Sequence, residues 1–102
     1  MRRAVLFTMT IALGLSQAQA GDIEAGKNLY ASNCAQCHGP TAKGMASFPS
    51  LIGRDADYTQ SRLETYRAGE KVGANSGLMI PNAKNLSDED IVNLVVFLSS
   101  KS

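Results

Sequence analysis

The sequence predicts an all-α domain in which three main helices are joined by long loops. Three segments place their apolar or aromatic residues at intervals of three or four, which is the spacing of one helix face. Glycine and proline gather between these segments, at residues 39–53 and again within residues 70–85, where regular structure is not expected. No part of the chain reads as strands alternating with helices, so a parallel sheet is not expected.

The first twenty residues differ in character from the rest. Arg2 and Arg3 precede an apolar stretch of about a dozen residues, and Ala18-Gln19-Ala20 follows as a small-residue cleavage pattern. This order is typical of a secretory signal peptide, and we expect cleavage after Ala20. A retained membrane anchor would need roughly 20 apolar residues, so none is expected. The mature domain is then residues 21–102.

The charge of this domain limits its partners, and its small size limits how it can be stabilised. Without Arg2 and Arg3, eight basic residues stand against nine acidic ones and form no basic stripe, so nucleic acid is not an expected partner. A domain this small buries little surface and usually needs a disulfide, a metal or a bound group to stabilise it.

The first expected helix runs from residue 22 to about residue 37, with Asp22 as its N-cap. Ile23, Gly26 and Tyr30 share one face of it. Glycine inside a helix costs about 1 kcal/mol relative to alanine, and close approach of another backbone would explain Gly26.

This helix ends on Cys34-Ala35-Gln36-Cys37-His38, and the spacing C-x-x-C-H is the attachment signature of c-type haem. Helix positions i, i+3 and i+4 lie on one face. Cys34 and Cys37 can therefore reach the two vinyl groups of one porphyrin and form thioethers. His38 then lies beneath the ring, where its imidazole can bind the iron as the proximal ligand.

Three other uses of two cysteines fit the chain less well. A disulfide is compatible with export, but a thioredoxin-like pair requires a βαβ context. A zinc site requires four ligands, and the chain has two cysteines and a single histidine. That histidine falls at the haem position, so the sequence predicts one covalently bound haem.

The second expected helix covers residues 56–68, with Asp55 or Asp57 as its cap and Gly69 as its stop. The last helix begins at Ser87, an N-cap followed by three acidic residues in the first turn. Four apolar residues then form a stripe at helical spacing, namely Ile91, Leu94, Val95 and Leu98.

A haem iron bound by His38 has a second axial position, for which the candidate side chains of the mature domain are Met45 and Met79. Met45 follows His38 too closely to pass easily to the opposite side of the ring. Met79 lies much further along, between Gly77 and Pro81, in a segment expected to be an irregular loop that presents one side chain. Met79 is the expected ligand, with ordinary core filling by Met79 and an open iron as alternatives.

With these motifs, residues 21–102 resemble a class I cytochrome c of the small bacterial monohaem type. They also resemble the single haem domains of dihaem periplasmic cytochromes. The similarity lies in the segments AGKNLY at 25–30, CAQCHG at 34–39 and FPSLIG at 48–53, in residues 58–69, and in residues 79–90.

The resemblance implies a cytochrome c fold, in which the N-terminal and C-terminal helices cross and Gly26 and Tyr30 pack near Leu94 and Phe97. It implies further roles at the haem. The Pro49 carbonyl accepts a hydrogen bond from His38, Leu51 packs on the haem, and Met79 is the axial methionine. For the haem propionates it offers only one weak candidate partner, Arg54.

The function that follows is periplasmic electron transfer by one His/Met-ligated haem c cycling between ferrous and ferric iron, in an electron carrier rather than an enzyme. Such a carrier makes weak, short-lived contacts with redox protein partners. The alternative is the haem subunit of a larger oxidoreductase, such as a flavocytochrome c sulfide dehydrogenase with its flavoprotein subunit. A haem enzyme or ligand sensor with an open iron is less expected, since the chain has no second histidine for acid–base work.

Overall fold

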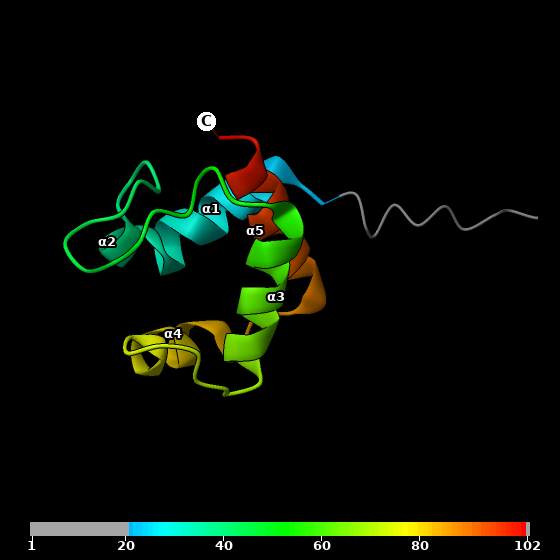
Figure 1. Ribbon diagram of the computed structural model, residues 1–102. Coiled ribbons are helices and arrows are strands. Elements are labelled where there is room, and N and C mark those ends of the chain that lie inside the picture. Colours follow the sequence, from blue (N-terminus) through cyan, green and yellow to red (C-terminus); the bar gives the residue numbers. More distant parts are fainter. Residues whose placement is uncertain (1–20, 102) are drawn as a thin grey trace, which may run out of the picture.

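The computed structural model describes residues 21–101, and within them the chain is helical (Figure 1). Its elements are α1 (Ile23–Asn33), α2 (Ala35–His38), α3 (Ala56–Arg67), α4 (Ser76–Ala83) and α5 (Asp88–Ser99). The described residues form no strand, and one isolated bridge joins Met45 to Phe48. The all-α prediction is therefore confirmed. The expected signal peptide, residues 1–20, lies outside the described residues.

The first expected helix is present as two segments that meet at Cys34. Asp22 is the N-cap, and its carboxylate accepts hydrogen bonds from the backbone N–H groups of Glu24 and Ala25 at 2.9 and 3.3 Å. At Cys34 the backbone turns to φ −118°, and the short α2 begins there. The N–H of His38 still bonds to the carbonyl of Cys34 at 2.9 Å, so the end of the haem motif keeps helical geometry.

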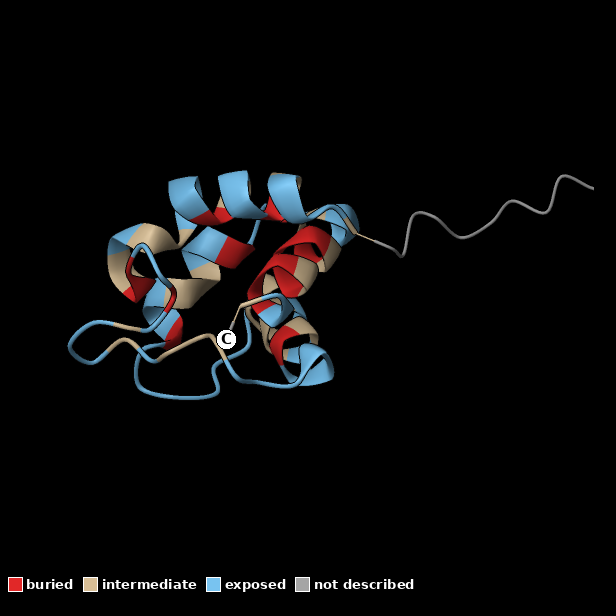
Figure 2. Cartoon of the chain, turned by 90° about the horizontal axis from the view of Figure 1, so that it is seen from above, coloured by how far each residue is buried: buried red, intermediate tan, exposed pale blue. Residues whose placement is uncertain are grey.

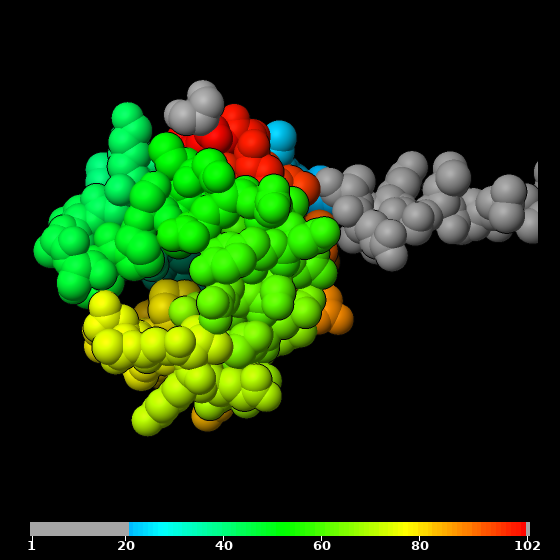
Figure 3. Space-filling model, in the orientation of Figure 1, coloured from blue at the N-terminus to red at the C-terminus, as the bar shows by residue number. Residues whose placement is uncertain are grey.

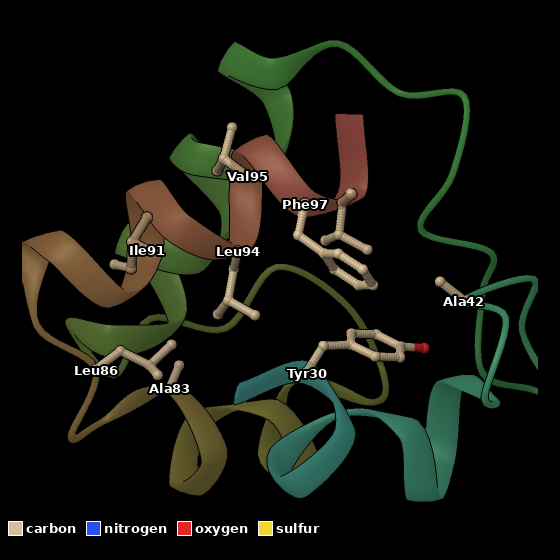
Figure 4. Close-up of a cluster of buried hydrophobic side chains, with 9 residues drawn as sticks. Tyr30, Ala42, Ala83, Leu86, Ile91, Leu94, Val95 and Phe97 are labelled. Carbon is tan, nitrogen blue, oxygen red and sulfur yellow. The ribbon is translucent and has the colours of Figure 1, made fainter. Parts of the chain in front are cut away.

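Helices α1 and α5 cross at close range, as the resemblance implied. A Cβ atom at Gly26 would lie 2.0 Å from the carbonyl oxygen of Asn93 and 2.8 Å from the Cβ of Phe97, so only glycine allows this approach. The rings of Tyr30 and Phe97 face one another with their centroids 5.5 Å apart (Figure 4).

The buried residues lie where the helices face each other, while the residues on the outer faces are exposed (Figure 2). Tyr30 is buried here, and its hydroxyl donates to the carbonyl of Gly39, which ties α1 to the loop after His38. Burial is the main cause that raises the pKa of Tyr30 to about 12, so the hydroxyl remains a donor at neutral pH. The apolar members of this core are Tyr30, Ala42, Ala83, Leu86, Ile91, Leu94, Val95, Phe97 and Leu98.

The end of α3 and the start of α5 agree with the sequence prediction. Gly69 stops α3 with φ +82°, a value that favours glycine. Asp55 holds the N-cap position of α3, although its side chain makes no capping hydrogen bond. Ser87 and Asp90 form a reciprocal capping box at the start of α5, with bonds of 3.0 and 2.9 Å.

The segment that carries Met79 departs from the sequence prediction. Residues 70–85 were expected to be irregular, but α4 occupies Ser76–Ala83, so the placement of Met79 in a shaped loop is wrong. Pro81 lies inside this helix, where it lacks the N–H that would otherwise bond to the preceding turn. The helix is short, so few of its backbone hydrogen bonds are affected, and Asn82 Nδ2 adds a bond to the carbonyl of Leu78 at 2.9 Å.

In the part of the chain that the structure describes, no helix has both the length and the apolar character needed to cross a membrane.

Candidate functional site

A cavity of about 380 Å³ opens between the loop of residues 39–53, α3 and α4. Figure 3 shows the molecule hollowed between this loop and α4. Its volume lies within the roughly 300–1,000 Å³ of small-molecule and cofactor pockets. The residues that line it include all six predicted from the sequence, namely Cys34, Cys37, His38, Pro49, Leu51 and Met79.

His38 lies at the end of α2 and is only 6% exposed. Its Nδ1 lies 2.9 Å from the carbonyl oxygen of Pro49, and a carbonyl can only accept, so the ring proton is on Nδ1. The lone pair of Nε2 is then free to bind a metal. The family resemblance implied this hydrogen bond, and it is present in the structure.

The loop of residues 39–53 carries Pro49 back to His38. The N–H of Gly44 bonds to the His38 carbonyl at 2.9 Å, and the N–H of Leu51 bonds to the Ala42 carbonyl at 2.8 Å. Ala42 is fully buried and has φ +61°, a strained value for a residue with a Cβ atom. These bonds fix the direction of the Pro49 carbonyl and bring Leu51 to the cavity wall.

Cys34 and Cys37 are both free thiols, half-buried at the same cavity. Burial, with a smaller effect of neighbouring Cys37, raises the pKa of Cys34 to about 11. The two sulfurs and the His38 ring therefore come from one short stretch of chain and lie along one wall. Residues 21–101 contain no cluster of three histidine, cysteine or acidic side chains suited to holding a metal ion.

Met79 reaches the cavity from α4, which belongs to a different part of the chain from α2. Ser76 fixes the start of α4, because its buried hydroxyl accepts from the N–H groups of Val72 and Gly73 at 2.8 and 2.9 Å. Met45, the other candidate, is 49% exposed and does not line the cavity.

The residues present fit a covalently attached haem. Two free thiols with the attachment spacing lie beside an imidazole whose Nε2 is available, and a thioether lies on the α4 side of the same cavity. Apolar side chains such as Leu63, Leu94 and Leu98 complete the wall, which suits a largely apolar ring.

Comparison with known proteins agrees with this site. The family model described as Cytochrome c matches residues 23–102. The chain belongs to the cytochrome c family. It therefore carries covalently bound haem c and serves in electron transfer rather than as an enzyme.

Among its relatives is cytochrome c-554(548) of Halomonas halodenitrificans, which is 41% identical over 83 residues, 80% of this chain and 99% of that protein. Cytochrome c-554(547) of Halothiobacillus neapolitanus is 36% identical over 79% of this chain and 98% of its own length. The solved structure of Acidithiobacillus ferrooxidans cytochrome c4 matches with a TM-score of 0.66 and 27% identity, over 76% of this chain and 48% of that one.

Three side chains near the cavity were not assigned by the sequence reasoning. Tyr58 and Arg62 line it from α3, and Ser76 holds the start of α4. The spacing of Arg54, Tyr58 and Arg62 at i, i+4 and i+8 was the available signal for the first two, because such positions share one face of a helix.

Proposed function

We propose that this cytochrome c is a periplasmic monohaem electron carrier whose iron is bound by His38 and Met79, with Cys34 and Cys37 as the thioether attachments. One observation carries the proposal: Met79 on α4 and His38 on α2 line the same cavity. When bound, the haem supplies a one-electron couple between ferrous and ferric iron.

His38 acts in this proposal through its Nε2 atom. The Pro49 carbonyl oxygen lies 2.9 Å from Nδ1, so it keeps the ring proton on Nδ1 and fixes the orientation of the ring. A hydrogen bond of this kind also makes the imidazole a more basic ligand. His38 is nearly fully buried, so water has little access to the imidazole.

Met79 would supply the second side-chain ligand to the iron, as expected of an electron carrier. A neutral thioether favours the ferrous state and raises the reduction potential. With His38 and Met79 both bound, the iron would have no vacancy for a substrate. Leu51 on the cavity wall helps to keep water away from the haem.

The test of the axial ligand compares Met79→Ala with Met45→Ala. The first variant should retain its covalent haem, lose the methionine-to-iron charge-transfer band, fall in potential and gain affinity for carbon monoxide. The second should retain all four properties of the wild type, because Met45 lies outside the cavity. An unchanged spectrum in Met79→Ala would show that the ligand assignment is wrong.

Export to the periplasm is the second part of the proposal. It rests on the leader pattern of residues 1–20, and it is supported by the close approach of Gly21, the first residue of the expected mature chain, to Val92 and Val96 of α5. Intact mass spectrometry of the mature protein should give residues 21–102 plus one haem. A stable full-length precursor would contradict cleavage after Ala20.

A second candidate is a haem subunit of a larger oxidoreductase, such as one with a flavoprotein partner. It is favoured by one observation: a subunit of the cbb3-type cytochrome c oxidase of Rhizobium leguminosarum is 34% identical to this chain, over 78% of this chain and 28% of that subunit. Purification of the native protein separates the two. A carrier should elute alone, whereas a subunit should elute with a flavin-containing chain.

A further inference from the structure

Tyr30 carries a buried hydroxyl that the packing of α1 against α5 does not require. The side chain is 2% exposed, and its ring lies against Phe97 with the centroids 5.5 Å apart. A phenylalanine would make the same ring contact without burying a polar group, which costs free energy unless the group is hydrogen-bonded. The hydroxyl donates to the carbonyl of Gly39, the residue directly after His38. It therefore acts on the chain beside the proximal ligand.

The Gly39 carbonyl is the meeting point of two donors. It accepts from the Tyr30 hydroxyl and also from the N–H of Ala42 at 3.2 Å. Figure 4 shows the Tyr30 oxygen directed toward Ala42. Ala42 has φ +61°, a backbone conformation that costs free energy for a residue with a Cβ atom and persists only where its surroundings hold it. The two bonds at Gly39 therefore hold the strained turn that begins the loop of residues 39–53.

This turn is tied in its own right to the segment that carries Pro49. The Ala42 carbonyl accepts from the N–H of Leu51 at 2.8 Å and from the hydroxyl of Ser50 at 3.4 Å. Gly44 lies against the same segment, since a Cβ atom there would be 2.9 Å from the carbonyl carbon of Pro49. Pro49 therefore has little freedom to move relative to Ala42, and the direction of its carbonyl depends on where the turn is held.

The Pro49 carbonyl accepts the hydrogen bond from Nδ1 of His38, 2.9 Å away. A stronger hydrogen bond at Nδ1 makes Nε2 a more electron-rich ligand, and an electron-rich ligand favours ferric iron. The geometry of this one bond therefore contributes to the reduction potential. Hydrogen bonds run from the Tyr30 hydroxyl, through Gly39 and Ala42, to the segment that carries this carbonyl.

We propose that Tyr30 is a positioning residue for the proximal ligand, because its hydroxyl holds the loop that directs the Pro49 carbonyl at His38. This inference rests on the proposed function, since it takes His38 as a ligand of the iron. Without the hydroxyl, the strained turn retains one bond at the Gly39 carbonyl instead of two. The loop should then loosen, the hydrogen bond from His38 to Pro49 should weaken, and the ferrous state should be favoured.

The test compares the midpoint potential of Tyr30→Phe with that of the wild type, both as holoproteins. The variant retains the ring contact with Phe97 and loses only the hydroxyl. Its potential should rise, with the one-electron equilibrium shifted about twofold to fivefold towards the ferrous state, which is roughly 18 to 41 mV. A potential that is unchanged or lower would overturn the proposal.

Proton exchange at His38 gives a second measurement, which reports on the hydrogen bond itself. In the ferrous holoprotein, NMR can follow the proton on Nδ1 as it exchanges with solvent. This exchange should be several times faster in Tyr30→Phe, because a weakened bond opens more often. The rate does not depend on which group fills the second axial position of the iron.

Val95→Ala is the control for a general loss of stability. Val95 is buried in the same core, but its side chain points away from Tyr30 (Figure 4). The control should lower the melting temperature through the cavity that it leaves, while the potential and the exchange rate at His38 stay near their wild-type values. If Tyr30→Phe behaved in the same way as Val95→Ala, the hydroxyl would only stabilise the fold and the positioning role would be refuted.

Failure of this inference can be told from failure of the proposed function. If Tyr30→Phe retains the methionine-to-iron band together with the wild-type potential, Tyr30 has no positioning role and the carrier function stands. If the wild type itself lacks that band, the assignment of Met79 is wrong, and the exchange rate at His38 still decides the role of Tyr30.

Discussion

The crossing of α1 and α5 and the haem side of the molecule are built in different ways. In the crossing, the two helices contact each other directly: the backbone of Gly26 lies against the carbonyl of Asn93, and the ring centroids of Tyr30 and Phe97 are 5.5 Å apart. On the haem side, the loop of residues 39–53 and α4 both face a cavity of about 380 Å³ (Figure 3). The chain supplies its own core at the crossing, whereas a haem held by Cys34, Cys37 and His38 would fill the cavity on the other side.

The largest expected effect comes from removing the haem. We predict that a double variant, Cys34→Ser with Cys37→Ser, is largely unfolded, because a small domain with an empty centre cannot offset its conformational entropy. Circular dichroism should show weak helicity without a cooperative thermal transition. If the double variant melted cooperatively, the crossing of α1 and α5 would be sufficient for the fold, and the haem side would not depend on the haem for its stability.

The next effect lies at the crossing itself. Gly26→Ala should destabilise the holoprotein by about 3 kcal/mol or more, since the new Cβ would lie 2.0 Å from a backbone oxygen that cannot move without shifting α5. Chemical denaturation with haem absorbance as the signal measures this change.

Gly77→Ala is the matched control on the haem side. A Cβ atom at Gly77 would meet no atom within 4 Å, and alanine is the better helix former in α4 by up to about 1 kcal/mol. We expect this variant to be neutral or slightly stabilised. Similar losses of unfolding free energy in Gly26→Ala and Gly77→Ala would show that the close approach at Gly26 does not cause the destabilisation.

The two regions also differ in how far the sequence predicts them. The helices α1 and α5 were predictable because their apolar residues repeat at helical spacing, whereas their crossing at Gly26 and Tyr30 followed only from the family resemblance. The haem motif was predictable because the spacing from Cys34 to His38 is local. Both are short-range patterns, and the contact with Pro49 followed only from the family resemblance.

The α4 segment was not predictable in the same way. Gly77 and Pro81 are both helix breakers, and in eight residues they outweigh the apolar pattern around Met79. The helix is instead supported by the bonds of the Ser76 hydroxyl to the turn before it and by the packing of α4 against α3, and neither shows in a pattern of helix formers and breakers. The place of Arg62 on the cavity wall was missed for a related reason. In a sequence, an arginine on a helix face is expected to be solvent-exposed, and only the structure shows the cavity beside it.

The smallest effect tests whether α4 depends on that hydroxyl. Ser76 is nearly fully buried, and its Oγ accepts from the N–H groups of Val72 and Gly73. Ser76→Ala leaves both donors without this partner and should cost about 1–2 kcal/mol of unfolding free energy. Ser32→Ala is the control, because the Ser32 hydroxyl donates to the Leu29 carbonyl on the exposed side of α1. It should change stability by less than about 0.5 kcal/mol.

The comparison predicts more than a loss of stability for Ser76→Ala. Because α4 carries Met79 but contributes little to the crossing, the methionine-to-iron band should disappear at a lower temperature than the helical signal of α1 and α5. Following both signals in one thermal scan measures the gap. If the two signals were lost together in this variant, α4 would be as firmly held as the crossing, and the haem side could not be treated as the more weakly supported region.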